Sequence, residues 1–200
     1  NLWGNNIQLR EQKDTWEEAP KDTYILTVPP EEASAKRTVV EIEFRRGDPV
    51  AVDGEELGPV ALIDTLNKVG GRCAVGRFDV VENRISGLKT REIYESPAAA
   101  ILLAAHRALS SITLEREVVH FKDALSQKYA DLVYEGKWFL PVREGLEAFF
   151  LKINESVTGS VKLGLCRGAI TVLGRKSPHS LFAPPQERGT PPSSPFKLAR

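Results

Sequence analysis

The sequence is poor in the residues that mark several large classes of protein. Its 200 residues include no Met, two Cys, three His and 8% aromatic residues, and Lys+Arg and Asp+Glu both number 27. A chain with zero net charge lacks the long-range field that phosphate backbones select, so nucleic acid is not expected as the main partner. Cys73 and Cys166 are too few and too isolated for a disulfide framework or a metal cluster, which predicts a reducing, cytoplasmic setting.

Membrane signals are also missing. No apolar run is long enough to span a bilayer, and no charged-then-apolar segment opens the chain, so we expect no membrane association. Because there is no Met, we expect that the first residue is not a translation start, and the opening Asn-Leu-Trp-Gly resembles the interior of a longer protein. Residues 183–200 combine five prolines with Gly, Ser and Thr. Such a stretch buries too little apolar surface to offset its ordering entropy, which predicts a disordered tail after a domain of residues 1–182.

The remaining sequence has the patterns of both strands and helices. Alternating or short apolar runs predict strands at residues 23–28, 38–44, 50–52, 75–81, 85–90, 159–166 and 169–173. Apolar residues at three- and four-residue steps predict helices that start at Pro59, Ser96-Pro97, Thr113 and Pro141, with Gly70-Gly71 and Gly136 as stops for the first and third. Strands on both sides of a block of helices, joined by hairpin turns, predict an α+β fold. Its sheet should be mostly antiparallel and covered by helices on at least one face.

Generic catalytic motifs do not identify the function. The sequence contains no phosphate-binding Gly-rich loop, no Gly-x-Ser-x-Gly elbow and no zinc-type His/Cys spacing. His106 and His120 fall on expected helices, where packing or solvent exposure is the simpler interpretation. No catalytic residue, cofactor-binding residue or metal ligand is therefore assigned from motifs.

One segment, residues 81–97, is dense in side chains that bind polar ligands. Glu82, expected at a strand end, is suited to hold an ammonium group, and the phenol of Tyr94 can donate to a carboxylate. The alternative is a solvated hairpin in which Glu82 only pairs with Arg84 or Arg91 at the surface. Composition alone favours the solvated hairpin. The position of the segment between an apolar strand and a helix start instead favours a ligand-binding site.

The same segment carries a resemblance to a known family. Residues 75–98, which read VGRFDVVENRISGLKTREIYESPA, resemble the long signature of argininosuccinate synthases. Further similar runs are NLWG at 1–4, TLEREVVHFK at 113–122, QKYADLVY at 127–134 and GRKSPHSL at 174–181. The resemblance runs in order from Asn1 to about Phe182.

The resemblance implies a carbon–nitrogen ligase of arginine biosynthesis. ATP, with Mg²⁺, would activate the ureido oxygen of citrulline as an adenylate, and the amine of aspartate would then displace AMP. In the family, the ATP loop and the aspartate contacts lie in an upstream domain, so the chain alone is expected to be inactive. Glu82 and Tyr94 match two citrulline-binding positions of the family. Asn6 stands at a third position, where the family has a serine, and a further serine lies just before Asn1 in the family.

The C-terminal end departs from the family. A homotetramer is expected for argininosuccinate synthases, but the sequence turns at Ala183 into the Pro-rich stretch, which argues against this assembly for the present chain. We interpret residues 1–182 as the synthetase portion that contributes part of the citrulline site. The alternative is a truncated, non-catalytic fragment that folds and binds, or only associates with other subunits.

Overall fold

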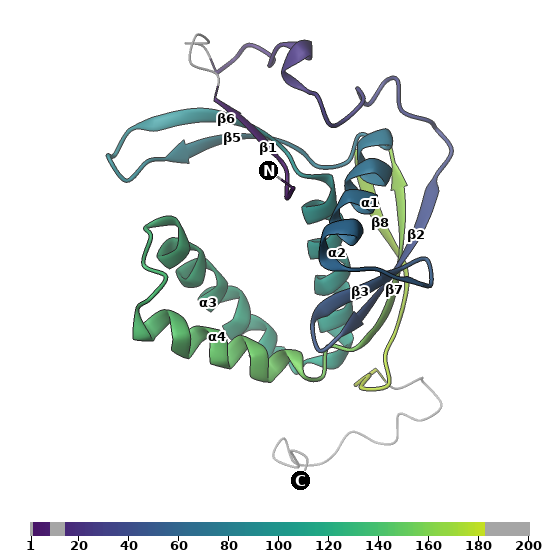
Figure 1. The fold of residues 1–200 in the computed structure, drawn as a ribbon, viewed down its shortest axis with the longest axis vertical. Helices are drawn as coiled ribbons and strands as arrows, with labels where there is room; N and C mark the ends of the chain where they lie inside the picture. The colour runs from purple at the N-terminus through teal and green to yellow at the C-terminus, as the bar shows by residue number, and fades with distance from the viewer. Residues whose placement is uncertain (1, 9–14, 183–200) are drawn as a thin grey trace.

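The computed structural model describes residues 2–8 and 15–182, which form two antiparallel sheets, four α-helices and one short 3₁₀ helix (Figure 1). In chain order, the elements are β1 (Asn5–Gln8), η1 (Lys21–Thr23), β2 (Thr38–Arg45), β3 (Asp48–Val52), β4 (Glu55–Glu56), α1 (Pro59–Arg72), β5 (Arg77–Asn83), β6 (Lys89–Glu95), α2 (Pro97–Thr113), α3 (Arg116–Tyr134), α4 (Pro141–Asn154), β7 (Gly159–Cys166) and β8 (Ala169–Lys176). The α+β fold class is confirmed. Within the described residues, no helix is both long and apolar enough to cross a membrane.

The larger sheet has the strand order β4-β3-β2-β7-β8 and builds the core. In β2, Val40, Ile42 and Phe44 are buried, as the alternation of apolar and charged residues predicts. Helices α1 and α2 pack together along one face of this sheet (Figure 1). The buried side of α2 includes Ile101 and Leu109, both fully inaccessible to solvent. Burial of large aliphatic side chains at this junction is the main stabilising contribution to the domain.

The smaller sheet has the order β1-β6-β5 and extends away from the core as a curved ribbon (Figure 1). Its hairpin turn lies between Arg84 and Leu88, where the Arg84 N–H donates to the Leu88 carbonyl at 2.8 Å. Gly87 has a φ of +82°, a conformation that favours glycine. We predicted the turn at residues 82–84 and a strand from 85, and this was wrong. Glu82 and Asn83 instead continue β5, because the turn needs the positive φ that only Gly87 supplies.

The predicted strand at residues 23–28 is also wrong. The backbone N–H groups of Ile25, Leu26 and Thr27 donate to the carboxylate of Glu95 at 2.9, 3.0 and 2.9 Å. Glu95 is only 1% exposed, so these bonds satisfy a buried charge. Since a side chain accepts the hydrogen bonds that a neighbouring strand would accept, this segment wraps around Glu95 and joins no sheet.

Two helix boundaries also differ from the prediction. Gly70 and Gly71 lie inside α1, and a Cβ at Gly71 would come within 2.3 Å of the Leu26 carbonyl oxygen. Close packing, and not a helix stop, thus explains this glycine. Thr113 is the last residue of α2 and donates to the Leu109 carbonyl, so it does not cap α3. The predicted tail, residues 183–200, lies outside the residues that the structure describes.

Candidate functional site

The three residues predicted to bind citrulline lie on one face of the small sheet. Tyr94 in β6 is directly opposite Asn6 in β1 and Phe78 in β5. Glu82 lies four residues beyond Phe78 on β5, opposite Thr90. Residues directly opposite each other, and residues an even number apart on one strand, point to the same side of a sheet. Asn6, Glu82 and Tyr94 therefore share a face, although they come from three different strands.

Glu82 and Tyr94 are in contact. The Tyr94 hydroxyl donates a hydrogen bond to the Glu82 carboxylate. Burial, followed by the hydrogen bond and negative charge of Glu82, raises the pKa of Tyr94 to about 12. The phenol therefore stays protonated near neutral pH and remains a hydrogen-bond donor.

Arg84 links Glu82 to a second carboxylate. Its guanidinium donates to the carboxylate of Glu92, and its Nε donates to Thr90 Oγ1 at 2.9 Å. A second guanidinium nitrogen lies 3.7 Å from Glu82 Oε2. Glu92 is 1% exposed, so its charge needs such a partner. Two carboxylates thus share one guanidinium, and this cluster of Glu82, Arg84 and Glu92 has a net charge that favours a cationic ligand.

The alternative pairing of Glu82 is present in part. Arg84 does approach Glu82, as the solvated-hairpin interpretation expects. Arg91, however, pairs with Asp79 at 2.6 Å, on the opposite face of the hairpin. One oxygen of Glu82 accepts a hydrogen bond from Tyr94, and the other faces Arg84. The Glu82 side chain is therefore held by two neighbours, and it is only partly exposed to solvent.

Glu92 and Thr90 were missed by the sequence interpretation. The alternation of side chains along β6 could have identified them. Thr90, Glu92 and Tyr94 are two residues apart, so they lie on the same face of β6. The shifted position of the hairpin turn obscured this alternation. Once the strand starts at Lys89, the period of two places Glu92 beside Tyr94.

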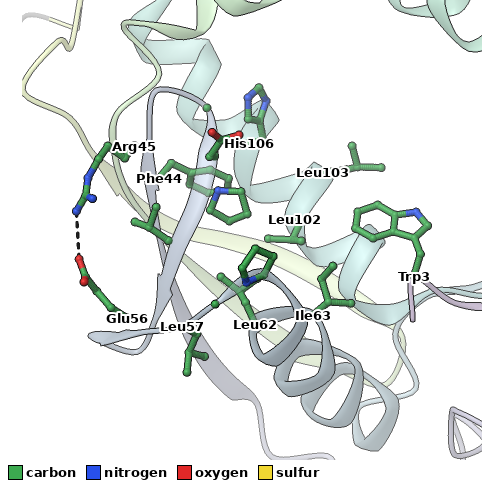
Figure 2. A pocket seen from close by; sticks show the side chains of 16 residues that line it. Trp3, Phe44, Arg45, Glu56, Leu57, Leu62, Ile63, Leu102, Leu103 and His106 are labelled. Carbon is green, nitrogen blue, oxygen red and sulfur yellow. Dashed lines mark hydrogen bonds and ion pairs between the residues drawn. The ribbon is translucent and has the colours of Figure 1, made fainter. Parts of the chain in front are cut away.

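A large cavity lies elsewhere in the molecule. Its volume is about 800 Å³, and it is bounded by the β2–β3 hairpin, the start of α1 and the side of α2. Figure 2 shows the side chains that line it. Its walls are mostly apolar, with Trp3 at one side and Phe44 and His106 close together. An ion pair between Arg45 and Glu56, at 3.1 Å, lies at its edge. None of the predicted citrulline-binding residues lines this cavity, so it is distinct from the candidate site.

The residues present offer no fit for a metal ion. Across residues 2–8 and 15–182, no three His, Cys, Asp or Glu side chains gather in a way that could hold one.

Comparison with known proteins agrees with the resemblance seen in the sequence. The family described as Arginosuccinate synthase C-terminal domain matches residues 1–187. The argininosuccinate synthase of Symbiobacterium thermophilum is 48% identical over 183 residues, which are 92% of this chain and 46% of that protein. Those of Chlorobium luteolum and Carboxydothermus hydrogenoformans are 46% and 48% identical over 182 residues each, 91% of this chain. The chain spans somewhat less than half the length of these relatives. The chain therefore belongs to the argininosuccinate synthase family and corresponds to its C-terminal domain.

Proposed function

We propose that this chain supplies part of the citrulline site of an argininosuccinate synthase, a ligase that joins citrulline to aspartate with ATP. The contact between Tyr94 and Glu82 carries the proposal. In an α-amino acid, the ammonium and carboxylate groups are attached to the same carbon. Protein groups that hold both must therefore lie within a few ångströms of each other, and a donor in contact with a carboxylate meets this requirement.

Each residue has a distinct role in this proposal. Glu82 accepts hydrogen bonds from the ammonium of citrulline, and Tyr94 donates to its carboxylate. Without ligand, Tyr94 donates to Glu82. When citrulline binds, its ammonium replaces that donor, and the phenolic O–H turns toward the carboxylate by rotation about one bond. Asn6, which is exposed and directly opposite Tyr94, lies where it can hydrogen-bond the same end of the ligand.

The chemical step is proposed to need groups outside this chain. Neither Glu82 nor Tyr94 acts as an acid or base in the proposal, since their work is to hold citrulline so that its ureido oxygen meets the α-phosphate of ATP. ATP, Mg²⁺ and aspartate would be bound mainly by the portion of the relatives that this chain does not span. We also propose that the protein is cytoplasmic. We propose a homotetramer only on the condition that assembly does not depend on the residues after Ala183.

A second candidate is a non-catalytic fragment that binds or associates. The absence of a Gly-rich nucleotide loop from the 200 residues favours it for the chain taken alone. Incubation of the purified chain with ATP, citrulline and aspartate should release no pyrophosphate above the rate without protein. Release that depends on all three substrates would exclude this second candidate and would show that the chain is catalytically complete.

Ligand-detected NMR tests the proposed site directly. L-Citrulline should show saturable binding to the chain, and N-acetyl-L-citrulline, which has no ammonium group, should bind much more weakly. L-Citrullinamide, which has no carboxylate, is the matched probe for Tyr94. Equal binding of all three compounds would mean that the α-carbon end of citrulline is not recognised here.

A further inference from the structure

A second cleft is lined mainly by residues of α2 and α3 and lies outside the Glu82 and Tyr94 cluster. Figure 1 shows the positions of these two helices. Its volume is about 710 Å³. The polar side chains that line it are His106 and Arg107 from α2 and Lys122, Asp123, Ser126 and Gln127 from α3. Two of these six carry positive charge and one carries negative charge, so the lining has a net positive charge near neutral pH.

Among the described residues, the two cations of this cleft have no carboxylate within ion-pair distance, although Asp123 lies near Lys122. Neither the Arg107 nor the Lys122 side chain makes a hydrogen bond or ion pair with the residues that the structure describes. Lys122 is partly buried, and burial lowers the pKa of its ammonium group. Asp123 opposes this shift, whereas the positive charge of Arg107 adds to it. Lys122 is thus a half-buried cation beside a second cation.

This arrangement costs free energy unless an anion joins it. Buried charges in proteins are normally paired, and Lys122, which is partly buried, bears part of the same desolvation cost, whereas Arg107 is exposed. Apart from Asp123, the neighbouring side chains of the lining supply no negative charge. Burial lowers the pKa of His106 to about 4, so this imidazole is neutral near pH 7. The Ser126 hydroxyl donates its hydrogen bond to the Lys122 carbonyl oxygen, at 2.8 Å.

One further donor faces the cleft. The Gln127 amide donates one N–H to Asp131 at 3.3 Å, which leaves its second N–H available. An oxyanion between the two cations could accept from this N–H as well as from Arg107 and Lys122. A guanidinium beside an ammonium is a usual combination for carboxylate and phosphate recognition.

We propose that the cleft between α2 and α3 binds a small oxyanion, a carboxylate or a phosphate, held between Arg107 and Lys122. Phe78, whose backbone position is opposite Tyr94, also lines this cleft. The oxyanion site therefore borders the face that carries Glu82 and Tyr94. The proposal stands on the unpaired cations and does not depend on citrulline binding.

Calorimetric titrations at constant ionic strength test this proposal with two probes, inorganic pyrophosphate and succinate. At least one probe should bind saturably to the chain, and the tighter one identifies phosphate or carboxylate as the preferred chemistry. K122Q and R107Q should each weaken binding about tenfold or more, as expected for loss of a charge-assisted hydrogen bond. K128Q is the matched control, because Lys128 is an exposed residue of α3 that does not line the cleft.

Several outcomes would overturn the site. They are the absence of saturable binding by both probes at millimolar concentration, and an equal loss in K128Q and K122Q, which would indicate a diffuse surface field. Thermal melts of each variant establish that it is folded. If K122Q is unfolded, R107Q and the charge-conserving K122R decide the question, since K122R should retain binding and R107Q should lose it.

Discussion

The hydroxyl of Tyr94 reaches the carboxylate of Glu82 although the two residues are not paired across β5 and β6. Tyr94 is opposite Phe78, and Glu82 lies four residues farther along β5, roughly 13 Å along an extended strand. The two long side chains must therefore lean toward each other over the same face of the sheet. Glu92 and Arg84 lie at the same part of the hairpin and complete a polar cluster there.

Substitution of Tyr94 by Phe tests the phenol. The variant keeps the ring but loses the donor, so the affinity for L-citrulline should fall by about 1–2 kcal/mol, or roughly five- to thirtyfold. The melting temperature should change little, since the Glu82 side chain is partly exposed and can be hydrated. Tyr129→Phe on α3 is the control and should leave the dissociation constant unchanged. An affinity equal to that of the unmodified chain in Tyr94→Phe would remove the phenol from the site.

Glu95 should be a structural residue and not a ligand-binding one. Its carboxylate accepts from three consecutive backbone N–H groups and from the Thr27 hydroxyl at 2.7 Å. Glu95→Gln replaces one acceptor oxygen by a donor, so we expect the free energy of unfolding to fall by about 2–3 kcal/mol. Urea denaturation measures the free energy of unfolding of both variants. Glu55→Gln, at an exposed position of β4, should change it by less than about 0.5 kcal/mol.

His106 should make the stability of the domain depend on pH. Its ring packs edge-on against Phe44 with centroids 5.8 Å apart, and burial lowers its pKa to about 4. Between about pH 6.5 and pH 4, the unfolded chain binds a proton at this histidine that the folded chain does not. The free energy of unfolding should therefore fall as the pH decreases through this window, by on the order of 2–3 kcal/mol from this group.

Two variants isolate that contribution from the titration of carboxylates. The loss of stability between pH 7 and pH 4.5 should be smaller in His106→Gln than in His120→Gln, which changes an exposed histidine of α3. The same loss in both variants would show that His106 is protonated as easily in the folded chain as in the unfolded one.

Residues 183–200 should be dispensable for the stability of the domain. Their five prolines and low aromatic content predict little burial of apolar surface. A chain that ends at Phe182 should melt within about 2 °C of the full chain by calorimetry. A larger decrease would show that this segment contributes contacts to the folded domain.

Much of the fold could be predicted because its signals are local. The alternation of Val40, Ile42 and Phe44 identifies a half-buried strand, and Pro59 and Pro141 do begin helices. The segment at residues 23–28 could not be predicted in this way. Its conformation depends on Glu95, about 70 residues away in the sequence, whose carboxylate takes the backbone donors that a strand partner would otherwise use.

The candidate site residues come from the resemblance to the family, and their role in binding citrulline stays a prediction. The resemblance indicated Glu82 and Tyr94, and the register of β5 and β6 brings both to one face. The role of Arg84 between Glu82 and Glu92 could not be read from spacing, because it depends on where the hairpin turns. The cleft proposed to bind an oxyanion depends on where α3 lies relative to α2, which no local pattern specifies.

The central claim is that Glu82 holds the ammonium group of citrulline. The most direct measurement compares the dissociation constant for L-citrulline of the unmodified chain, Glu82→Gln and the control Glu55→Gln by titration calorimetry. Loss of the Glu82 charge should cost about 1.5–3 kcal/mol of binding free energy, with no change in the control. In a full-length relative that carries the same substitution, the affinity for ATP should change little. An unchanged citrulline affinity in Glu82→Gln would contradict the account.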